Sequence, residues 1–258
     1  MSKILYEQKD GIVSIILNNP KALNAINTEM WNELRESLAR FRDDPEMRVA
    51  IITGAGDRAF SCGNDISELA AKDAKPHEID FSASMLPSLD PERGLTVWKP
   101  IIAAVNGYCF GSGFFIALSC DIRISSDNAT FATPEVKLGL MPNMGVTQWL
   151  PRVVPLGVAL ELLLSGRTLS AHDAFHFGFV NRVVPQGELL QAAEALAREI
   201  CDNGPVAVNR AKEAVYRGLG MPLTEGLNLE NRLAHLTMQS EDAKERLRAF
   251  IERKKKNT

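Results

Sequence analysis

The sequence has few of the residues that hold metals or form disulfides. It contains four histidines and four cysteines in 258 residues, and no two cysteines form a Cys-x-x-Cys pair. His172 and His176 are spaced as on one helix face, but no third ligand accompanies them. We therefore expect neither a zinc site nor a redox-active dithiol. The cysteines are Cys62, Cys109, Cys120 and Cys201.

An excess of positive charge is also absent. Lys and Arg number 29 against 32 Asp and Glu, which gives a net charge of −3. The one cationic cluster is residues 253–256. Nucleic acid is therefore not an expected partner. The first residues lack the apolar stretch of a signal peptide and the arginines of a transit peptide, so we expect a cytoplasmic protein.

Long hydrophobic runs are scarce. Residues 100–120 carry no charge, but Asn106, three glycines and two serines interrupt them. A membrane span is thereby disfavoured, and no membrane partner is expected. The pattern instead indicates a buried strand at residues 101–105 and a buried helix at residues 114–120 of a globular core.

The order of the remaining segments predicts an α/β domain. Strands are expected at residues 4–8 and 12–17, followed by a helix whose cap is Asn27 or Thr28, and by a strand at residues 49–53. A loop is expected over residues 54–64 and an irregular segment over residues 72–94. Short strands are expected at residues 122–125, 130–131 and 180–184, and helices at residues 65–69, 145–154, 156–164, 170–177, 189–201, 205–218, 223–239 and 241–254. We accordingly expect an α/β core at residues 1–200 and a helical C-terminal region at residues 201–258.

Three glycines stand between the predicted strand and helix of the central stretch. Gly107, Gly111 and Gly113 lie within seven positions of one another. A strand, a glycine-rich turn and a helix start bring free backbone N–H groups together, which suits an anion or a carbonyl oxygen that becomes negative. Tight packing of a turn explains the same glycines, and the glycines alone favour that interpretation, because glycines are common at helix starts.

Four motifs occur in order along nearly the whole chain. They are Pro20-Lys21-Ala22-Leu23-Asn24-Ala25, Ala59-Phe60-Ser61-Cys62-Gly63-Asn64-Asp65-Ile66, the stretch from Lys99-Pro100 to Asp121, and Pro134-Glu135-Val136-Lys137-Leu138-Gly139. Together they resemble the crotonase superfamily, the enoyl-CoA hydratase/isomerase family. The resemblance implies a crotonase-like spiral of β-β-α turns, with C-terminal helices that build a homotrimer or a dimer of trimers. It also implies an acyl-CoA thioester as substrate and no metal or redox cofactor, because coenzyme A is part of the substrate.

The resemblance assigns the reacting groups. The two backbone N–H donors of the family's oxyanion hole fall on Asn64 and on Ser112, the middle residue of Gly111-Ser112-Gly113. The family more often has three glycines there, so the serine leaves the shape of the hole open. The conserved Pro-Glu carboxylate of the family's hydratases falls on Glu135, and their second glutamate falls on Phe115.

Phe115 is the most informative departure. Hydration of a double bond shares its proton transfers between two carboxylates, whereas moving a double bond from C3 to C2 needs one base. We therefore expect 3-enoyl-CoA to 2-enoyl-CoA isomerisation, with Glu135 as the single acid and base. An apolar wall at Phe115 would exclude water and raise the pKa of Glu135.

By resemblance, residues 21–23 and 61–64 line the nucleotide and pantetheine path, and Phe250 and Lys254 reach the phosphates or adenine. The full set of predicted substrate-binding residues is Lys21, Ala22, Leu23, Ser61, Cys62, Gly63, Asp65, Ile66, Gly111, Gly113, Phe115, Pro134, Asn143, Phe250 and Lys254.

Two other hypotheses stay open at this point. One is a 2-enoyl-CoA hydratase in which Ser112, Asn143 or a water network replaces the missing carboxylate. The other, of a different class, is a non-catalytic protein that binds CoA thioesters or acts as a scaffold. Ser112 as a nucleophile is disfavoured, because Phe110 stands where a Gly-x-Ser-x-Gly turn needs glycine.

Overall fold

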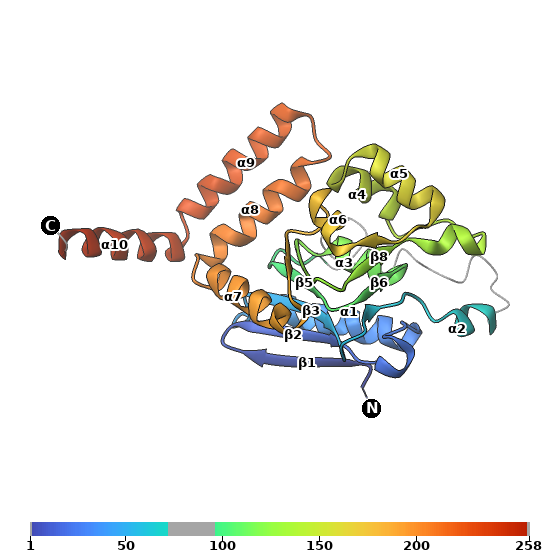
Figure 1. The fold of residues 1–258 in the computed structure, drawn as a ribbon. Coiled ribbons are helices and arrows are strands. Elements are labelled where there is room, and N and C mark those ends of the chain that lie inside the picture. The colour runs from blue at the N-terminus through green and yellow to red at the C-terminus, as the bar shows by residue number, and fades with distance from the viewer. Residues whose placement is uncertain (1, 72–95, 257–258) are drawn as a thin grey trace.

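The structure is a computed structural model, and it describes residues 2–71 and 96–256 (Figure 1). Its centre is a six-stranded sheet of order β1-β2-β3-β5-β7-β10, in which β1 and β2 are antiparallel and the other neighbours are parallel. The strands are β1 (Ile4–Lys9), β2 (Ile12–Leu17), β3 (Val49–Gly54), β5 (Ile101–Val105), β7 (Ile122–Ser126) and β10 (Arg182–Val184).

Helices cover both faces of this sheet. Ala50 and Ile52 of β3 belong to the core cluster that includes α1 (Thr28–Asp43), while Val49 and Ile51 belong to a second cluster that includes α7 (Leu189–Cys201). Alternate residues of a strand point to opposite faces, which explains why β3 and β5 are buried along their whole length. The continuous apolar runs predicted as buried strands are confirmed.

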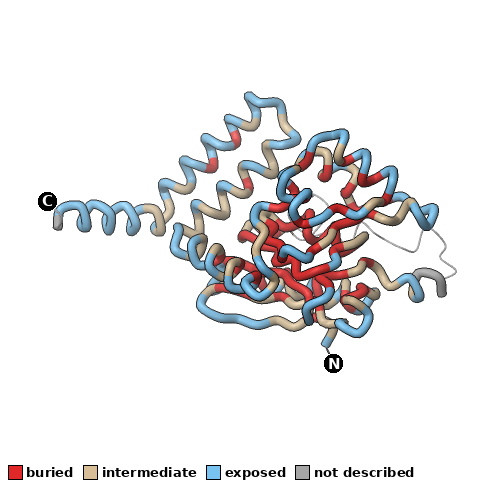
Figure 2. The backbone as a smooth tube through the Cα atoms, viewed as in Figure 1, coloured by how far each residue is buried: buried red, intermediate tan, exposed pale blue. Residues whose placement is uncertain are grey.

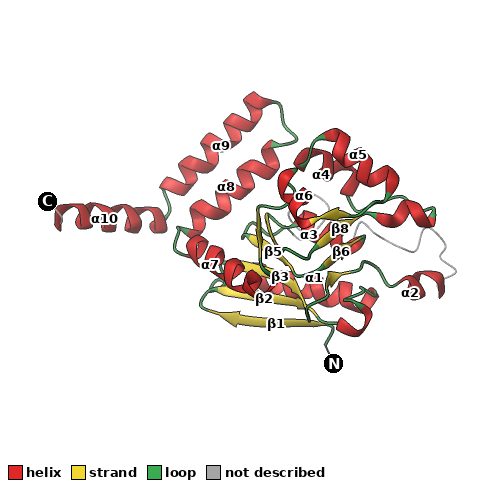
Figure 3. Cartoon of the chain, in the orientation of Figure 1, coloured by secondary structure: helices red, strands yellow, loops and turns green. Residues whose placement is uncertain are grey.

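A second, smaller sheet lies beside the first and carries the predicted motifs (Figure 3). Its strands β4 (Ala59–Ser61), β6 (Tyr108–Phe110) and β8 (Thr130–Ala132) are parallel, and β9 (Leu169–Ser170) pairs with β8 in the antiparallel sense. The predicted loop over residues 54–64 is therefore wrong where it includes β4. Strands of three residues are too short to show an alternating pattern in a sequence.

Helices make up much of the remaining described chain, and the α-helices follow the predicted order. Asn27 caps α1 through its side chain, which accepts from the Met30 N–H, and Ser170 accepts from the Asp173 N–H at the start of α6. The other helices are η1 (Pro20–Ala22), α2 (Ile66–Ala71), α3 (Ser112–Ser119), η2 (Pro134–Leu138), α4 (Val146–Val153), α5 (Leu156–Ser165), α6 (Ala171–His176), η3 (Gln186–Glu188), α8 (Pro205–Gly218), α9 (Leu223–Met238) and α10 (Glu241–Lys256).

Helix α8 joins the C-terminal helices to the core through a buried ion pair. Lys212 lies 2.7 Å from a carboxylate oxygen of Asp121, and its ammonium group also donates to the Lys99 carbonyl. The same Asp121 oxygen accepts from the Ile101 N–H at the start of β5. Removing one partner would leave a buried charge uncompensated, so this contact anchors the middle of α8 beside the start of β5.

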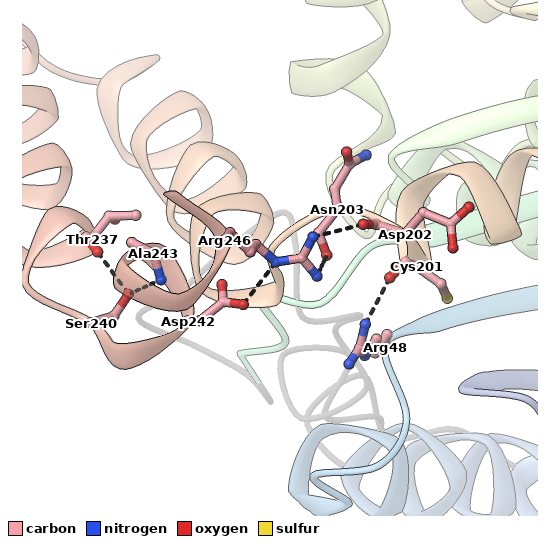
Figure 4. Close-up of polar contacts among 9 residues, drawn as sticks. All are labelled: Arg48, Cys201, Asp202, Asn203, Thr237, Ser240, Asp242, Ala243 and Arg246. Carbon is pink, nitrogen blue, oxygen red and sulfur yellow. Dashed lines mark hydrogen bonds and ion pairs between the residues drawn. The ribbon is translucent and has the colours of Figure 1, made fainter. Parts of the chain in front are cut away.

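Helix α10 is held at its base and projects away from the two sheets (Figures 1 and 4). Arg246 is paired with Asp242 and donates to the carbonyls of Asp202 and Asn203, just after α7. Arg48 donates to the carbonyl of Cys201, the last residue of α7. Cationic side chains at a helix C-terminus commonly donate to its free carbonyls, as Arg48 and Arg246 do at the end of α7. Because Arg246 belongs to α10, its contacts there set the direction of α10.

Burial differs strongly along the chain (Figure 2). The sheets and α3 are buried, whereas most of α9 and α10 is exposed. Among the described residues, no helix combines the length and the apolar character needed to cross a membrane. The predicted irregular segment at residues 72–94 lies outside the described residues.

Candidate active site

The predicted reacting groups follow three neighbouring strands of the small sheet. In the register, Ser61 of β4 is paired with Cys109 of β6, and Phe110 of β6 is paired with Ala132 of β8. Carboxyl ends of parallel strands meet at one edge of a sheet, where α/β proteins commonly bind ligands. Residues 62–64, 111–112 and 133–135 are therefore brought to the same edge.

Close contacts confirm that these segments touch. A Cβ atom added to Gly63 would lie 3.0 Å from the Phe110 carbonyl oxygen and 3.3 Å from the Ser112 nitrogen. A Cβ atom added to Gly111 would lie 3.3 Å from Oε1 of Glu135. Both glycines have positive φ, 99° at Gly63 and 52° at Gly111, so a side chain would strain the backbone as well as crowd the site.

Two backbone N–H groups are left for a ligand at this edge. Asn64 precedes α2 and Ser112 opens α3, and within the described chain neither amide N–H has a hydrogen-bond partner. Their neighbours are well fixed: the Asp65 N–H donates to the Ile26 carbonyl, and the Gly63 N–H donates to Oγ of Ser61. Fixed, unpaired donors are what stabilises a carbonyl oxygen that gains negative charge.

Glu135 lies in η2, half-buried, beside Gly111. Its Oε2 atom is buried without a hydrogen-bond partner among the described residues. Burial raises the pKa of this carboxyl, and its own backbone N–H opposes the shift more weakly. A partly desolvated carboxylate with an unused oxygen is suited to accept a proton from a bound molecule and to return it.

Phe115 belongs to the hydrophobic core. Its side chain is 1% exposed, and its ring lies 6.5 Å from the ring of Trp31 on α1. Phe115 is thus a buried residue of α3 that supplies no carboxylate. The expectation that the pKa of Glu135 is raised agrees with the structure, and the cause is burial of the carboxyl.

The two segments predicted to line the nucleotide and pantetheine path contact each other. The Cys62 N–H donates to the Leu23 carbonyl, and the Cys62 thiol contacts the Ala22 carbonyl at 3.4 Å. Lys21 and Ala22 are exposed at the surface of η1, and Ile66 at the start of α2 is 55% exposed. Asp65 uses its carboxylate to accept from the Ser67 N–H and so starts α2.

The remaining predicted residues divide into three groups. Gly113 is a packing residue, because a Cβ there would lie 2.4 Å from the Ser61 carbonyl oxygen. Pro134 begins η2, and Asn143 is exposed in the turn before α4. Phe250 and Lys254 lie on α10, which Figure 1 shows at the opposite end of the molecule from α2. One chain therefore does not bring these two residues to the others.

Sequence reasoning missed one residue of this region. The indole N–H of Trp31, on α1, donates to Oδ1 of Asn64 at 3.0 Å. The only available signal was a half-polar tryptophan in an amphipathic helix, and that pattern is as common for simple packing residues.

The fold brings two unpaired main-chain N–H groups and a half-buried carboxylate to one sheet edge, an arrangement suited to polarising a carbonyl and to moving a proton. The sequence profile of the enoyl-CoA hydratase/isomerase family matches residues 7–257. A carnitinyl-CoA dehydratase of Salmonella typhi is 41% identical over 98% of this chain and 97% of its own. A short-chain-enoyl-CoA hydratase of Clostridium acetobutylicum is 37% identical over 99% of this chain and 97% of its own.

A solved structure agrees with these sequence matches. The enoyl-CoA hydratase of Bacillus anthracis superposes with a TM-score of 0.91, at 33% identity, over 97% of this chain and 96% of that chain. The chain belongs to the enoyl-CoA hydratase/isomerase family, whose members act on CoA thioesters. The crotonase-like fold predicted from the motifs is thereby confirmed.

Proposed function

We propose that this enzyme isomerises 3-enoyl-CoA to 2-enoyl-CoA with Glu135 as its single acid and base. The observation that carries the proposal is the pair of side chains at the edge of the small sheet. Glu135 offers an unpartnered, partly desolvated carboxylate oxygen, and Phe115 occupies the position at which the family's hydratases have a second glutamate. A 1,3 proton transfer needs one base that serves twice.

The reaction follows from the two donors and the carboxylate. The N–H groups of Asn64 and Ser112 bind the thioester oxygen. Glu135 takes a proton from C2, so the electrons of that C–H bond pass into an enolate held by the two donors. The conjugated enolate then takes the proton from Glu135 at C4, and the double bond lies between C2 and C3. Such a donor is typically worth about 3 kcal/mol in the transition state.

We also propose that copies of the chain assemble through the C-terminal helices, as a homotrimer or a dimer of trimers. Leu247, Phe250 and Ile251 form an exposed apolar stripe on α10, spaced three and four residues apart. A groove of about 350 Å³ runs between α8 and α9 and is lined mainly by small and apolar side chains. In such an assembly Phe250 and Lys254 of one copy meet the coenzyme A of another.

The enzyme works in the cytoplasm without a metal or redox cofactor.

A paired assay tests the proposed reaction. Purified enzyme receives 3-hexenoyl-CoA in one sample and 2-hexenoyl-CoA in another, and products are followed by mass and by the absorbance of the conjugated thioester. We expect conversion of the 3-enoyl substrate without a change of mass. The matched control is Glu135→Gln, which keeps the side-chain volume and removes the base. Equal turnover by that variant contradicts the assignment of Glu135.

The names of the relatives favour a second candidate, the addition or removal of water. It requires a second group to hold the water, for which Ser112, Asn143 or a water network was considered above. An 18-dalton gain on 2-hexenoyl-CoA supports this candidate. Binding of both thioesters without turnover supports the non-catalytic alternative.

A further inference from the structure

The hydrogen bond between Trp31 and Asn64 fixes the orientation of a carboxamide beside the oxyanion donors. The indole nitrogen lies 3.0 Å from Oδ1 of Asn64. An indole N–H can only donate, so the amide must present its oxygen to Trp31. The NH2 group of Asn64 then faces elsewhere, and within the described chain it has no hydrogen-bond partner.

This bond is not needed to hold the main chain of the site. The Ile26 N–H donates to the Gly63 carbonyl, and the Asp65 N–H donates to the Ile26 carbonyl, on either side of Asn64. The Cys62 N–H donates to the Leu23 carbonyl. The main chain around Asn64 is thus already fastened to the segment before α1. What the Trp31 contact adds is a single orientation of the Asn64 side chain.

The surroundings make that orientation consequential. Trp31 donates to Asn64 through its N–H and packs near Phe115 through its ring, so one side chain connects the carboxamide with the residue at the position of the family's second glutamate. A polar N–H group with no protein partner is costly unless a ligand or water accepts from it. A substrate oxygen at this position would satisfy the amide, whereas a plain alkyl chain would displace water from it without replacement.

We infer that Asn64 is a specificity-determining residue for acyl groups that carry an oxygen acceptor, and that Trp31 is the positioning residue that aims its NH2 group. The substrate class is then an acyl-CoA thioester with a hydroxyl or carbonyl oxygen on the acyl chain. This inference rests on the acyl-CoA binding of the proposed function. It does not depend on whether the reaction is isomerisation or hydration.

Binding measurements separate the inference from the reaction itself. Dissociation constants of hexanoyl-CoA and of its 4-, 5- and 6-hydroxy derivatives are measured by calorimetry, because these saturated thioesters lack the 3-hydroxyl that a hydratase would remove as water. The proteins are the parent enzyme, Asn64→Ala, Trp31→Phe and the double variant. Asn64→Ala keeps the main-chain N–H of the oxyanion hole. Trp149→Phe is the matched control, since Trp149 is also half-buried but packs on Tyr216 of α8.

The expected result is a change in the ratio of the dissociation constants of the hydroxy derivatives and of hexanoyl-CoA. At least one hydroxy derivative should bind the parent about tenfold tighter than hexanoyl-CoA, as for one good hydrogen bond. Asn64→Ala should abolish that preference, so that the hydroxy derivative and hexanoyl-CoA bind this variant within about twofold of each other. Trp31→Phe should lower the preference about threefold to tenfold, and the double variant should equal Asn64→Ala. Trp149→Phe should match the parent.

Other outcomes overturn the inference. If Asn64→Ala weakens all four thioesters equally, the bond between Trp31 and Asn64 is only a structural clamp. If the parent shows no preference for any hydroxy derivative, the amide is not a specificity group. If no thioester binds the parent, the proposed function fails first and the inference falls with it. In the ¹H–¹⁵N spectrum, an indole N–H of Trp31 that exchanges equally fast in the parent and in Asn64→Ala would contradict the hydrogen bond itself.

Discussion

The edge of the small sheet and the C-terminal helices are opposite in construction. At the sheet edge, Ser61, Gly63 and Ser112 are buried, and their backbones are locked by hydrogen bonds or by contacts too close for a side chain. On the C-terminal helices, large apolar side chains face outward: Leu223 is 79% exposed and Phe250 is 66% exposed. The sheet edge is held by contacts within one chain, whereas the helices leave large apolar side chains exposed.

The two regions are suited to two different tasks, stabilisation of a negative oxygen and assembly of chains. Stabilising a negative oxygen requires donors that do not move when charge appears, and main-chain N–H groups on a packed sheet edge meet that need. Assembly requires self-complementary surface, and the proposed assembly would use the exposed helices. If this division holds, substitutions at the edge should affect chemistry and folding within one chain. Substitutions on the helices should affect association first.

The largest effect is expected from Glu135→Gln. The substitution removes the only carboxylate assigned to proton transfer and preserves its shape, so kcat should fall about 10³-fold. The dissociation constant for a saturated acyl-CoA should stay within about threefold of the parent, since the two N–H donors remain. Steady-state kinetics and calorimetry on the same preparations check both values. A variant with parent-like kcat would show that the chemistry lies elsewhere.

Packing at the edge is tested by Gly113→Ala. The added Cβ would lie 2.4 Å from the Ser61 carbonyl oxygen and 2.8 Å from its Cβ, so backbone must shift. Unfolding free energy should fall by about 1–3 kcal/mol, as for other overpacked sites. Gly157→Ala in α5 is the control: nothing lies within 4 Å of its added Cβ, and a helical alanine should stabilise by about 0.5–1 kcal/mol. Equal effects of the two changes, measured by denaturant unfolding, would mean that the edge tolerates movement.

The proposed role of α10 in association is tested by the substitution Leu247→Glu. Leu247 is 58% exposed on the apolar stripe of α10, so the charge should disfavour association by at least tenfold. Stability of the separate chain should change by less than about 0.5 kcal/mol, as is usual for exposed positions. Sedimentation over a range of concentrations measures the assembly, with Arg248→Glu on the same helix as the control. Unchanged assembly in Leu247→Glu would remove α10 from the interface.

Most of the fold could be predicted because its signals are local. The apolar run of β5 and the amphipathic pattern of α7 each mark one element without reference to the rest of the chain. The strand β4 could not be predicted, because its three residues form a strand only through pairing with β6. Pairing between distant segments leaves no periodic pattern in a short stretch.

The site shows the same limit. The motifs indicated Glu135 and the two N–H donors, and the structure brings all three segments to one edge. The motifs did not indicate the contact between Trp31 and Asn64, which joins a helix to a loop 33 residues away. They also grouped Phe250 and Lys254 with the rest, although α10 extends in the other direction. Where a helix points is decided by contacts such as those of Arg246, which no local pattern records.

The smallest predicted effect concerns stability at the sheet edge. Burial raises the pKa of Glu135 above its ordinary value of 4.5, so the ionised carboxylate is less favourable in the folded chain than in the unfolded chain. The free-energy cost of ionising Glu135 in the folded chain is absent below pH 4.5. It grows as the pH rises from 4.5 to the raised pKa, and above that pKa it is constant. Glu135→Gln lacks the cost and should therefore be more stable than the parent at pH 8, with the advantage shrinking as the solution is acidified. Thermal unfolding of both proteins between pH 4 and 8 measures this difference. If the stability advantage of Glu135→Gln instead grows on acidification, the ionised carboxylate of Glu135 is stabilised in the folded chain. The sheet edge would then favour the charged form of Glu135, which contradicts a raised pKa.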